Sequence, residues 1–329
     1  MMLIEETFEP QLWARNPHLQ TIFGSLNIRL IEQNAMLDQA REVIVDGGEG
    51  VRLLGYHSRY PGNQVADLVL MIHGWEGSSD SAYILSTGRY LYERGFDIFR
   101  LNLRDHGNSH HLNEGLFHGA LIEEILHAAG EISKLARGFF FIVGFSLGGN
   151  FALRVALRAP QAGIGNLKEV VCISPSLDPY KATVSIDRSL PIYRHYFLRK
   201  WKKSLSKKQF FFPLKYDFRS MLHLKSCMEL TDAIMIYYPE FPTYMDYFRR
   251  YTLTGNIVDG LSIPVTIIAS EDDPVVPVDD ILGLKANGFM NRLIQPYGGH
   301  CGFLKPFPYG CWYERKIHDI FTAKGVRQL

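Results

Sequence analysis

Short apolar runs alternate with longer stretches of helical periodicity through most of the chain. The apolar runs, rich in Val, Ile, Leu and Phe, span 68–74, 96–103, 139–144, 169–174 and 265–270. Helical spacing of apolar residues occupies roughly 82–94, 119–136 and 147–158. Continuous apolar strands that alternate with helices are typical of a parallel sheet covered on both faces. We therefore predict an α/β fold with a mainly parallel central sheet flanked by helices.

Two regions depart from this alternation. From about residue 40, REVIVDGGEGVRLLGYHS has two apolar-alternating arms around Asp46, Gly47 and Gly48, which predicts a hairpin. Between about 178 and 260, Tyr, Phe and Met are mixed with Lys and Arg, as in SLPIYRHYFLRKWKKSLSKKQ, which predicts a largely helical insertion. Because the insertion follows the strand at 169–174, we expect it to cover the site edge of the sheet as a lid.

These patterns give four segments. We predict an N-terminal arm over 1–39, the first part of the core over 40–177, the lid over 178–260 and the second part of the core over 261–329.

The sequence FIVGFSLGGNFAL at 141–153 runs from a predicted strand through Gly-x-Ser-x-Gly into a predicted helix. In such a sharp turn, side chains two positions before and after the serine would collide. Glycine at 144 and 148 avoids this collision because it has no side chain. The hydroxyl of Ser146 then projects at the amino end of a helix, which suits a nucleophile.

A serine nucleophile needs a base, and the base needs a carboxylate that orients it. EDDPVVP follows the strand VTIIAS, and GGHCGF follows the predicted last strand, LIQPY. His300 is the expected base, and Asp273 or Asp272 the carboxylate. Asp273 is favoured because Pro274 disfavours helical backbone before it. The order Ser, Asp, His is that of α/β hydrolases and differs from trypsin-like and subtilisin-like proteases.

A tetrahedral oxyanion also requires two main-chain donors. Leu147, directly after the serine, supplies one N–H, and the loop HGWEGSS at 73–79 supplies the other, which we assign to Trp75. His73 is expected to organise this loop rather than to react.

Composition narrows the function classes. The chain has 329 residues and a formal net charge of only +1, so it lacks the strong positive charge that would favour binding to nucleic acid. Four cysteines without a CxxC pair argue against a zinc knuckle or a disulfide framework, and the N-terminus MMLIEETFEPQLWARNPHLQT lacks the pattern of a secretory signal. No apolar run reaches membrane-spanning length, so we expect a cytoplasmic protein.

The chain resembles the YheT-like branch of the α/β hydrolases, which is related to the abhydrolase-domain lipid esterases. The resemblance rests on Gly-x-Ser-x-Gly, NPHLQTIFGS at 16–25, HGWEGSS, LNLRDHGNS at 101–109, LFHG at 116–119 and GGHCGF at 298–303. It implies hydrolysis of acyl or lipid esters without a cofactor, and a loop-bracing role for Asp105 and His106. Three residues depart from the usual pattern: Trp75 stands where a smaller aliphatic residue is usual, Cys301 follows the base, and Gly119 replaces a more usual serine.

Two further groups of residues have alternative interpretations. His106, His110, His111 and His118 lie close in sequence, but their loop placement favours structural roles over a metal site, and we predict no metal. The basic and aromatic residues of 193–208 fit a solvated face of a lid helix, or a contact with anionic lipid headgroups.

We therefore predict a carboxylesterase or lipase-like serine hydrolase with catalytic Ser146, His300 and Asp273, oxyanion donors Trp75 and Leu147, and no cofactor. Cys301 is not expected to be the nucleophile, because it would leave the Ser146 turn unexplained. Two alternatives stay open: an acyltransferase that uses the same residues, and a catalytically idle hydrolase fold that binds a ligand.

Overall fold

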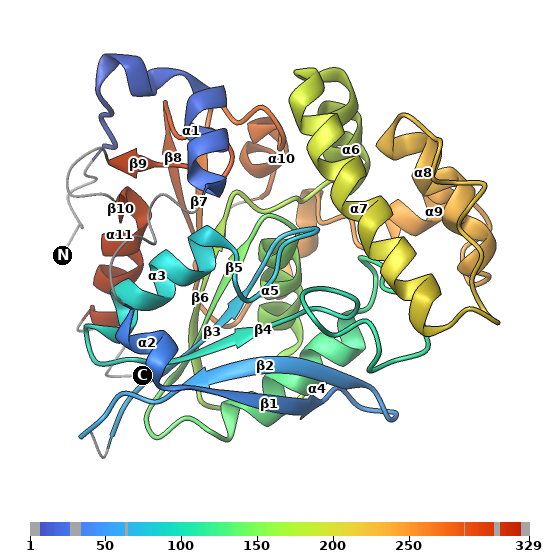
Figure 1. Cartoon of the computed structure of the whole chain (residues 1–329). Coiled ribbons are helices and arrows are strands. Elements are labelled where there is room, and N and C mark those ends of the chain that lie inside the picture. The colour runs from blue at the N-terminus through green and yellow to red at the C-terminus, as the bar shows by residue number, and fades with distance from the viewer. Residues whose placement is uncertain (1–6, 27–33, 63–64, 286, 306–309, 324–329) are drawn as a thin grey trace.

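The computed structural model describes residues 7–26, 34–62, 65–285, 287–305 and 310–323, and is built around an eight-stranded sheet (Figure 1). The strands are β1 (Ala40–Asp46), β2 (Arg52–Ser58), β3 (Leu68–Ile72), β4 (Asp97–Leu101), β5 (Phe140–Phe145), β6 (Leu167–Ile173), β7 (Val265–Ser270) and β8 (Met290–Gln295). Their order is β1-β2-β4-β3-β5-β6-β7-β8, and the pairs from β4 to β8 are all parallel. The predicted α/β fold is confirmed.

The predicted hairpin forms the antiparallel edge of this sheet. Its register pairs Asp46 with Arg52, and β2 in turn pairs antiparallel with β4. Gly47 N–H donates to Val51 O at 2.8 Å, which closes the connection between the arms.

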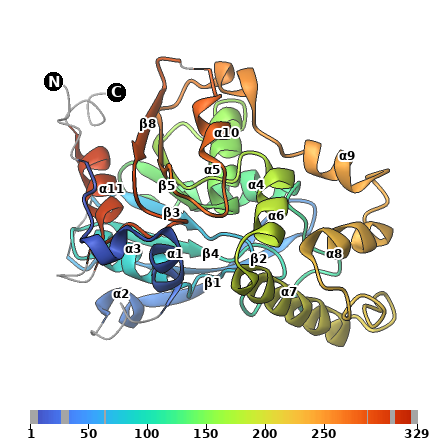
Figure 2. The ribbon, with the colours of Figure 1, turned by 90° about the horizontal axis from the view of Figure 1, so that it is seen from above.

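Helices cover both faces of the sheet, which explains the continuous apolar runs. On one face lie α4 (Ile122–Ser133) and α5 (Leu147–Arg158), and on the other lie α3 (Ala82–Tyr92) and α11 (Trp312–Thr322) (Figures 1 and 2). Strand β5 alternates between the two layers: Phe140 and Ile142 pack with α4 and α5, whereas Phe141 and Val143 pack with α3 and α11.

Shorter elements complete the described core. They are η1 (Leu12–Arg15), α1 (Pro17–Ser25), α2 (Ala35–Asp38), α10 (Val278–Leu282) and the small pair β9 (Leu304–Lys305) and β10 (Gly310–Cys311). Helix α1 begins as its sequence dictates: the Asn16 side chain accepts from the N–H groups of His18 and Leu19, and Pro17 occupies the first turn.

The segment 178–260 holds α6 (Pro179–Arg188), α7 (Pro191–Phe211), α8 (Cys227–Ile234), η3 (Met235–Tyr237), α9 (Tyr244–Arg249) and η4 (Gly255–Gly260). Figure 2 shows α6, α7, α8 and α9 gathered at one side of the molecule. Side chains of α6, α7 and α8 contribute to a hydrophobic cluster that includes Ile186, Leu205, Leu230 and Ile234, whereas Phe248 of α9 belongs to the cluster beside the sheet. Within the described residues, no helix is long and apolar enough to span a membrane.

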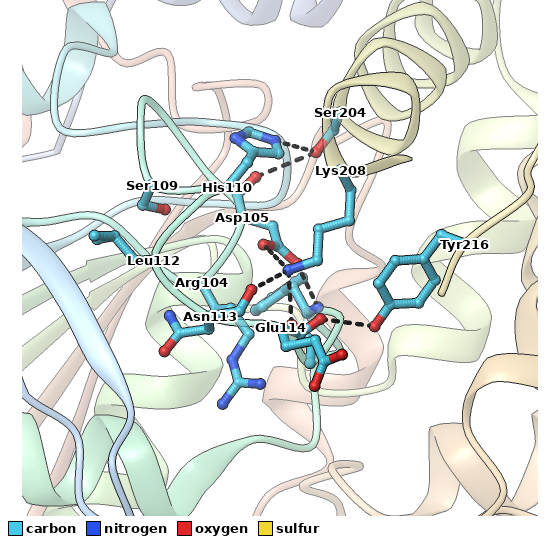
Figure 3. A network of polar contacts seen from close by, with 12 residues as sticks. Arg104, Asp105, Ser109, His110, Leu112, Asn113, Glu114, Ser204, Lys208 and Tyr216 are labelled. Atoms are coloured by element: carbon cyan, nitrogen blue, oxygen red, sulfur yellow. Dashed lines mark hydrogen bonds and ion pairs between the residues drawn. The ribbon is translucent and has the colours of Figure 1, made fainter. Parts of the chain in front are cut away.

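The basic residues of α7 do not all lie on a solvated face. Lys208 is fully buried, and its Nζ donates to Asp105 Oδ1 at 2.8 Å, to Asn113 O at 2.6 Å and to Gly115 O at 2.9 Å (Figure 3). The solvated interpretation is therefore wrong for Lys208, because an ammonium group can enter the interior where a carboxylate and carbonyls satisfy it. Ser204 Oγ adds a bond to Asp105 O at 3.2 Å, so α7 is anchored to the loop after β4.

Candidate active site

Ser146 occupies the sharp turn between β5 and α5. Its backbone has φ 53° and ψ −118°, a conformation that non-glycine residues rarely adopt. A Cβ on Gly144 would lie 2.2 Å from Gly148 O, and one on Gly148 would lie 2.2 Å from Ile72 O. The predicted need for glycine on both sides of the serine is confirmed.

Three side chains from separate loops form a chain of hydrogen bonds. His300 Nε2 lies 3.0 Å from Ser146 Oγ, and His300 Nδ1 lies 2.8 Å from Asp273 Oδ2. The other oxygen of Asp273 accepts from Val275 N–H at 2.8 Å and Val276 N–H at 2.9 Å, which fixes the carboxylate. The side chains of His300 and Asp273 are 10% and 2% exposed, so water competes little with these bonds.

Asp272 has a different role from its neighbour. Its Oδ1 accepts from Gly299 N–H at 2.8 Å, in the turn that carries His300, and burial raises the pKa of the carboxyl. Of the two aspartates that the sequence offered, Asp273 is the one that contacts His300.

The carboxylate of Asp273 controls the charge of His300. Burial alone lowers the pKa of an imidazole, but the nearby Asp273 charge, the adjacent Cys301 and the hydrogen bond to Asp273 together outweigh it and raise the pKa of His300 well above 6.5. The imidazole is thus prepared to accept a proton and to hold it as imidazolium.

The two predicted oxyanion donors lie beside Ser146. The side chains of Trp75 and Leu147 both line a cavity that Ser146 also lines. Within the described part of the chain, neither main-chain N–H donates to a protein acceptor, so both are available to a ligand.

The loop that carries Trp75 is held by neighbours on both sides. His73 is buried, with Nδ1 2.7 Å from Gly74 O and Nε2 accepting from Leu103 N–H at 3.1 Å, as expected of a residue that organises the loop. The next amide, Glu76 N–H, donates to His106 Nε2 at 3.2 Å, which agrees with the bracing role implied for His106.

The family model described as alpha/beta hydrolase fold matches residues 67–306. The chain belongs to the α/β-hydrolase family. It is 25% identical over 334 aligned positions to Protein ABHD15 of Homo sapiens, covering 95% of this chain and 68% of that protein. It is 24% identical to the Synechocystis protein named "Putative esterase slr0264", covering 80% of this chain and 78% of that one. Its fold matches Pyrococcus furiosus esterase Pf2001 with a TM-score of 0.54 at 13% identity, covering 86% and 92% of the two chains.

Two cavities of this α/β hydrolase meet at Ser146. The first lies under the insertion helices and is lined by residues such as Ala182, Ile186, Ile234 and Tyr238; we call it the lid cavity. The second lies between α1 and α7, and we call it the arm cavity. Its lining includes Ile22, Tyr83, Tyr196, Lys200 and His300.

Trp75 forms part of the partition between these cavities. Its ring stacks on Phe197 with centroids 5.2 Å apart and meets Trp201 edge-on at 5.0 Å. Both partners belong to α7, so the bulky residue that departs from the usual family pattern is packed against the insertion. Trp75 and Phe197 line both cavities, and they limit the space beside Ser146.

Gly119, a second departure, is explained by its surroundings. A Cβ on Gly119 would lie 2.6 Å from the ring of Tyr251, and Gly119 N–H donates to Tyr247 Oη at 3.0 Å. The serine that is usual here would collide with the Tyr251 ring. Cys301, the third departure, is buried, and its Sγ lies 3.8 Å from Ile173 O.

The histidines between 106 and 118 have separate partners. His110 Nε2 lies 2.9 Å from Ser204 Oγ, and His118 Nε2 lies 3.1 Å from Glu240 Oε1. Among the residues that the structure describes, no group of three or more His, Cys, Asp or Glu side chains is placed to hold a metal ion.

The sequence analysis missed the part that the N-terminal arm plays. Thr21 Oγ1 accepts from His300 N–H at 2.9 Å, and Gln20 Oε1 accepts from Leu304 N–H at 2.7 Å. A Cβ on Gly299 would lie 2.4 Å from Pro17 O, so α1 packs directly on the backbone of the His300 turn. The motif NPHLQT marked this segment as distinctive, but nothing in it indicated that the segment contacts the His300 turn.

Proposed function

We propose that this α/β hydrolase cleaves carboxylic esters through an acyl-enzyme formed on Ser146, with His300 as general base and acid and Asp273 as the residue that orients the imidazole. The observation that carries the proposal is the continuous hydrogen-bond chain from Ser146 Oγ through His300 to Asp273. The names "Putative esterase slr0264" and "Esterase Pf2001" agree with this reaction class.

In the first half-reaction, Ser146 Oγ attacks the ester carbonyl while His300 Nε2 takes the hydroxyl proton. The carbonyl oxygen becomes an oxyanion, which the N–H groups of Trp75 and Leu147 stabilise. The imidazolium then gives its proton to the leaving alcohol, and an acyl ester on Ser146 remains.

In the second half-reaction, His300 takes a proton from water, and the hydroxide attacks the acyl ester. The same two N–H groups stabilise the second oxyanion. Collapse of this intermediate returns the proton to Ser146 Oγ, so one ester and one water give one acid and one alcohol.

The lid cavity supplies a surface for the acyl chain. Its walls include Ala182, Ile186, Ile234 and Val276, which are apolar and buried. Burial of an alkyl chain stabilises binding by about 0.8 kcal/mol per methylene, so neighbouring chain lengths should differ only modestly in rate.

The test is hydrolysis of p-nitrophenyl esters from acetyl to long acyl chains by the wild type and by Ser146→Ala. We expect release of p-nitrophenol that depends on chain length and is lost in the variant. Folded wild type that releases nothing, or a Ser146→Ala variant that keeps the wild-type rate, would overturn the proposal.

A further inference from the structure

The two cavities at Ser146 differ in their relation to His300. His300 lines the arm cavity, whereas Leu147, which carries one of the oxyanion donors, lines the lid cavity. Ser146 lines both, so an ester bound at its hydroxyl can extend in two directions.

The chemistry of the proposed reaction assigns the two directions. His300 Nε2 must donate its proton to the leaving oxygen, so the alcohol part of the ester has to lie on the side of His300. The acyl part then extends the other way, into the lid cavity with its apolar walls. This assignment rests on the proposed function.

The walls of the arm cavity differ in charge from those of the lid cavity. Among the described lining residues of the arm cavity, Lys200 is the one Lys or Arg, and none is Asp or Glu. The described lining of the lid cavity contains no Lys, Arg, Asp or Glu. A cation on one side of the nucleophile and none on the other makes the site electrostatically asymmetric.

Lys200 is held at this wall with donors to spare. Its Nζ donates to Glu76 O at 3.2 Å and lies 4.7 Å from the centre of the Tyr196 ring. No carboxylate of the described residues forms an ion pair with it. Glu76 supplies the carboxyl that interacts electrostatically with Lys200, and burial raises the pKa of this carboxyl to about 8 although the Lys200 charge lowers it, which weakens the negative charge beside Lys200 near neutral pH.

We propose that the arm cavity binds the alcohol part of the substrate and that this alcohol carries an anionic group, such as a phosphate or a carboxylate, which pairs with Lys200. An ammonium group beside an apolar wall favours an anionic partner through a charge-assisted hydrogen bond. The substrate class is thus an acyl ester of an anionic alcohol rather than of a neutral one.

The experiment compares two pairs of esters that share their acyl chain: monobutyrylglycerol with butyrylglycerol phosphate, and phenyl butyrate with 3-carboxyphenyl butyrate. We expect kcat/KM of the wild type to be roughly 10- to 100-fold higher for the anionic member, the range of one hydrogen bond to a charged group. In Lys200→Met the anionic-to-neutral ratio should fall close to one, and in Lys200→Arg it should recover. If the wild type prefers the anionic ester in the glycerol pair but not in the phenyl pair, the site is specific for phosphates.

Lys203→Met, an exposed change on the same helix, is the matched control and should keep the wild-type ratio. Lys200→Met also removes the hydrogen bond to Glu76 O, which could slow hydrolysis of both esters equally. The anionic-to-neutral ratio of kcat/KM cancels such a common effect. A wild-type ratio near one, or an unchanged ratio in Lys200→Met, would overturn the inference. Hydrolysis of p-nitrophenyl butyrate by the same preparations separates the two claims, since loss of that Ser146-dependent activity concerns the proposed function instead.

Discussion

Thr21 Oγ1, in helix α1, accepts a hydrogen bond at 2.9 Å from the main-chain N–H of His300, 279 residues further along the chain. The same hydroxyl donates to Pro17 O at 2.7 Å, so its direction is fixed. The N-terminal arm therefore positions the turn that carries the proposed general base.

Thr21→Val keeps the shape of the side chain and removes the acceptor. The His300 N–H is then left unpaired, which costs about 1–3 kcal/mol and loosens the imidazole. We expect kcat to fall about tenfold with little change in KM for short esters. Steady-state kinetics, with circular dichroism to verify folding, measure this. Ser133→Ala, which removes a hydroxyl that donates to Gly130 O in α4 outside both cavities, is the control, and equal effects of the two changes would contradict a positioning role.

The pH dependence should reveal the influence of Asp273 on His300. The reaction needs neutral His300, so activity falls as pH decreases through its pKa, which Asp273 raises. Asp273→Asn removes that charge, so the acid limb of the kcat/KM profile should move to lower pH while kcat falls by about 10³- to 10⁴-fold. In Asp272→Asn, the acid limb of the kcat/KM profile should stay at the wild-type pH. An unmoved limb in Asp273→Asn would contradict the assignment.

Substitution in the lid cavity should change acyl preference. Ala182 is buried on α6 and lines this cavity, so Ala182→Phe takes up space that an acyl chain would use. We expect the preferred p-nitrophenyl ester to become shorter, with kcat/KM for long chains falling about tenfold, equal to the loss of roughly two buried methylenes. Val184→Phe, on the same helix but outside the cavity lining, should keep the wild-type order of esters. Identical chain-length profiles for both variants would argue against acyl binding here.

Anchoring of α7 should depend on Lys208. Lys208→Met leaves the buried Asp105 carboxylate without its cation, a change that costs about 3–5 kcal/mol of unfolding free energy. Adding Asp105→Asn should recover part of this loss. Urea denaturation measures both variants, with the exposed Lys203→Met as reference. Equal stability of Lys208→Met and Lys203→Met would show that the ion pair does not anchor the helix.

Contact of 193–208 with anionic lipid stays a prediction, and the structure narrows its surface. Ile192, Tyr196, Arg199 and Lys203 are exposed and spaced to share one face of α7. Charge reversal of Arg199 and Lys203 to Glu should weaken binding to anionic vesicles about tenfold or more and spare soluble esters. Arg59→Glu, an exposed change in the loop directly after β2, is the control. Equal loss on vesicles and soluble esters would contradict the membrane contact.

The parts of the site that are local in sequence could be predicted. The turn at Ser146 needs glycine at 144 and 148 because of contacts within a few residues and with the next strand, and the pattern carries that requirement. The loops with Asp273 and His300 follow recognisable strands, and the parallel arrangement brings strand ends to one edge.

The parts of the site that depend on contacts between residues far apart in the sequence could not be predicted. Nothing near Thr21 signals its bond to His300, because the partner comes from the other end of the chain. The sequence leaves a solvated face or a lipid contact open for all the basic residues of 193–208, because helical periodicity alone does not mark Lys208 as the one that is buried against Asp105. The separation of two cavities by Trp75 and Phe197 likewise depends on where α7 packs.

The central claim is that Ser146 is an activated nucleophile, and covalent labelling tests it most directly. The folded protein is incubated with diethyl p-nitrophenyl phosphate, and the adduct is located by intact-mass and peptide mass spectrometry. The account predicts one diethylphosphoryl group on Ser146, none on Ser146→Ala and slow labelling of His300→Ala. An unlabelled wild type, or an adduct on another residue such as Cys301, would contradict it.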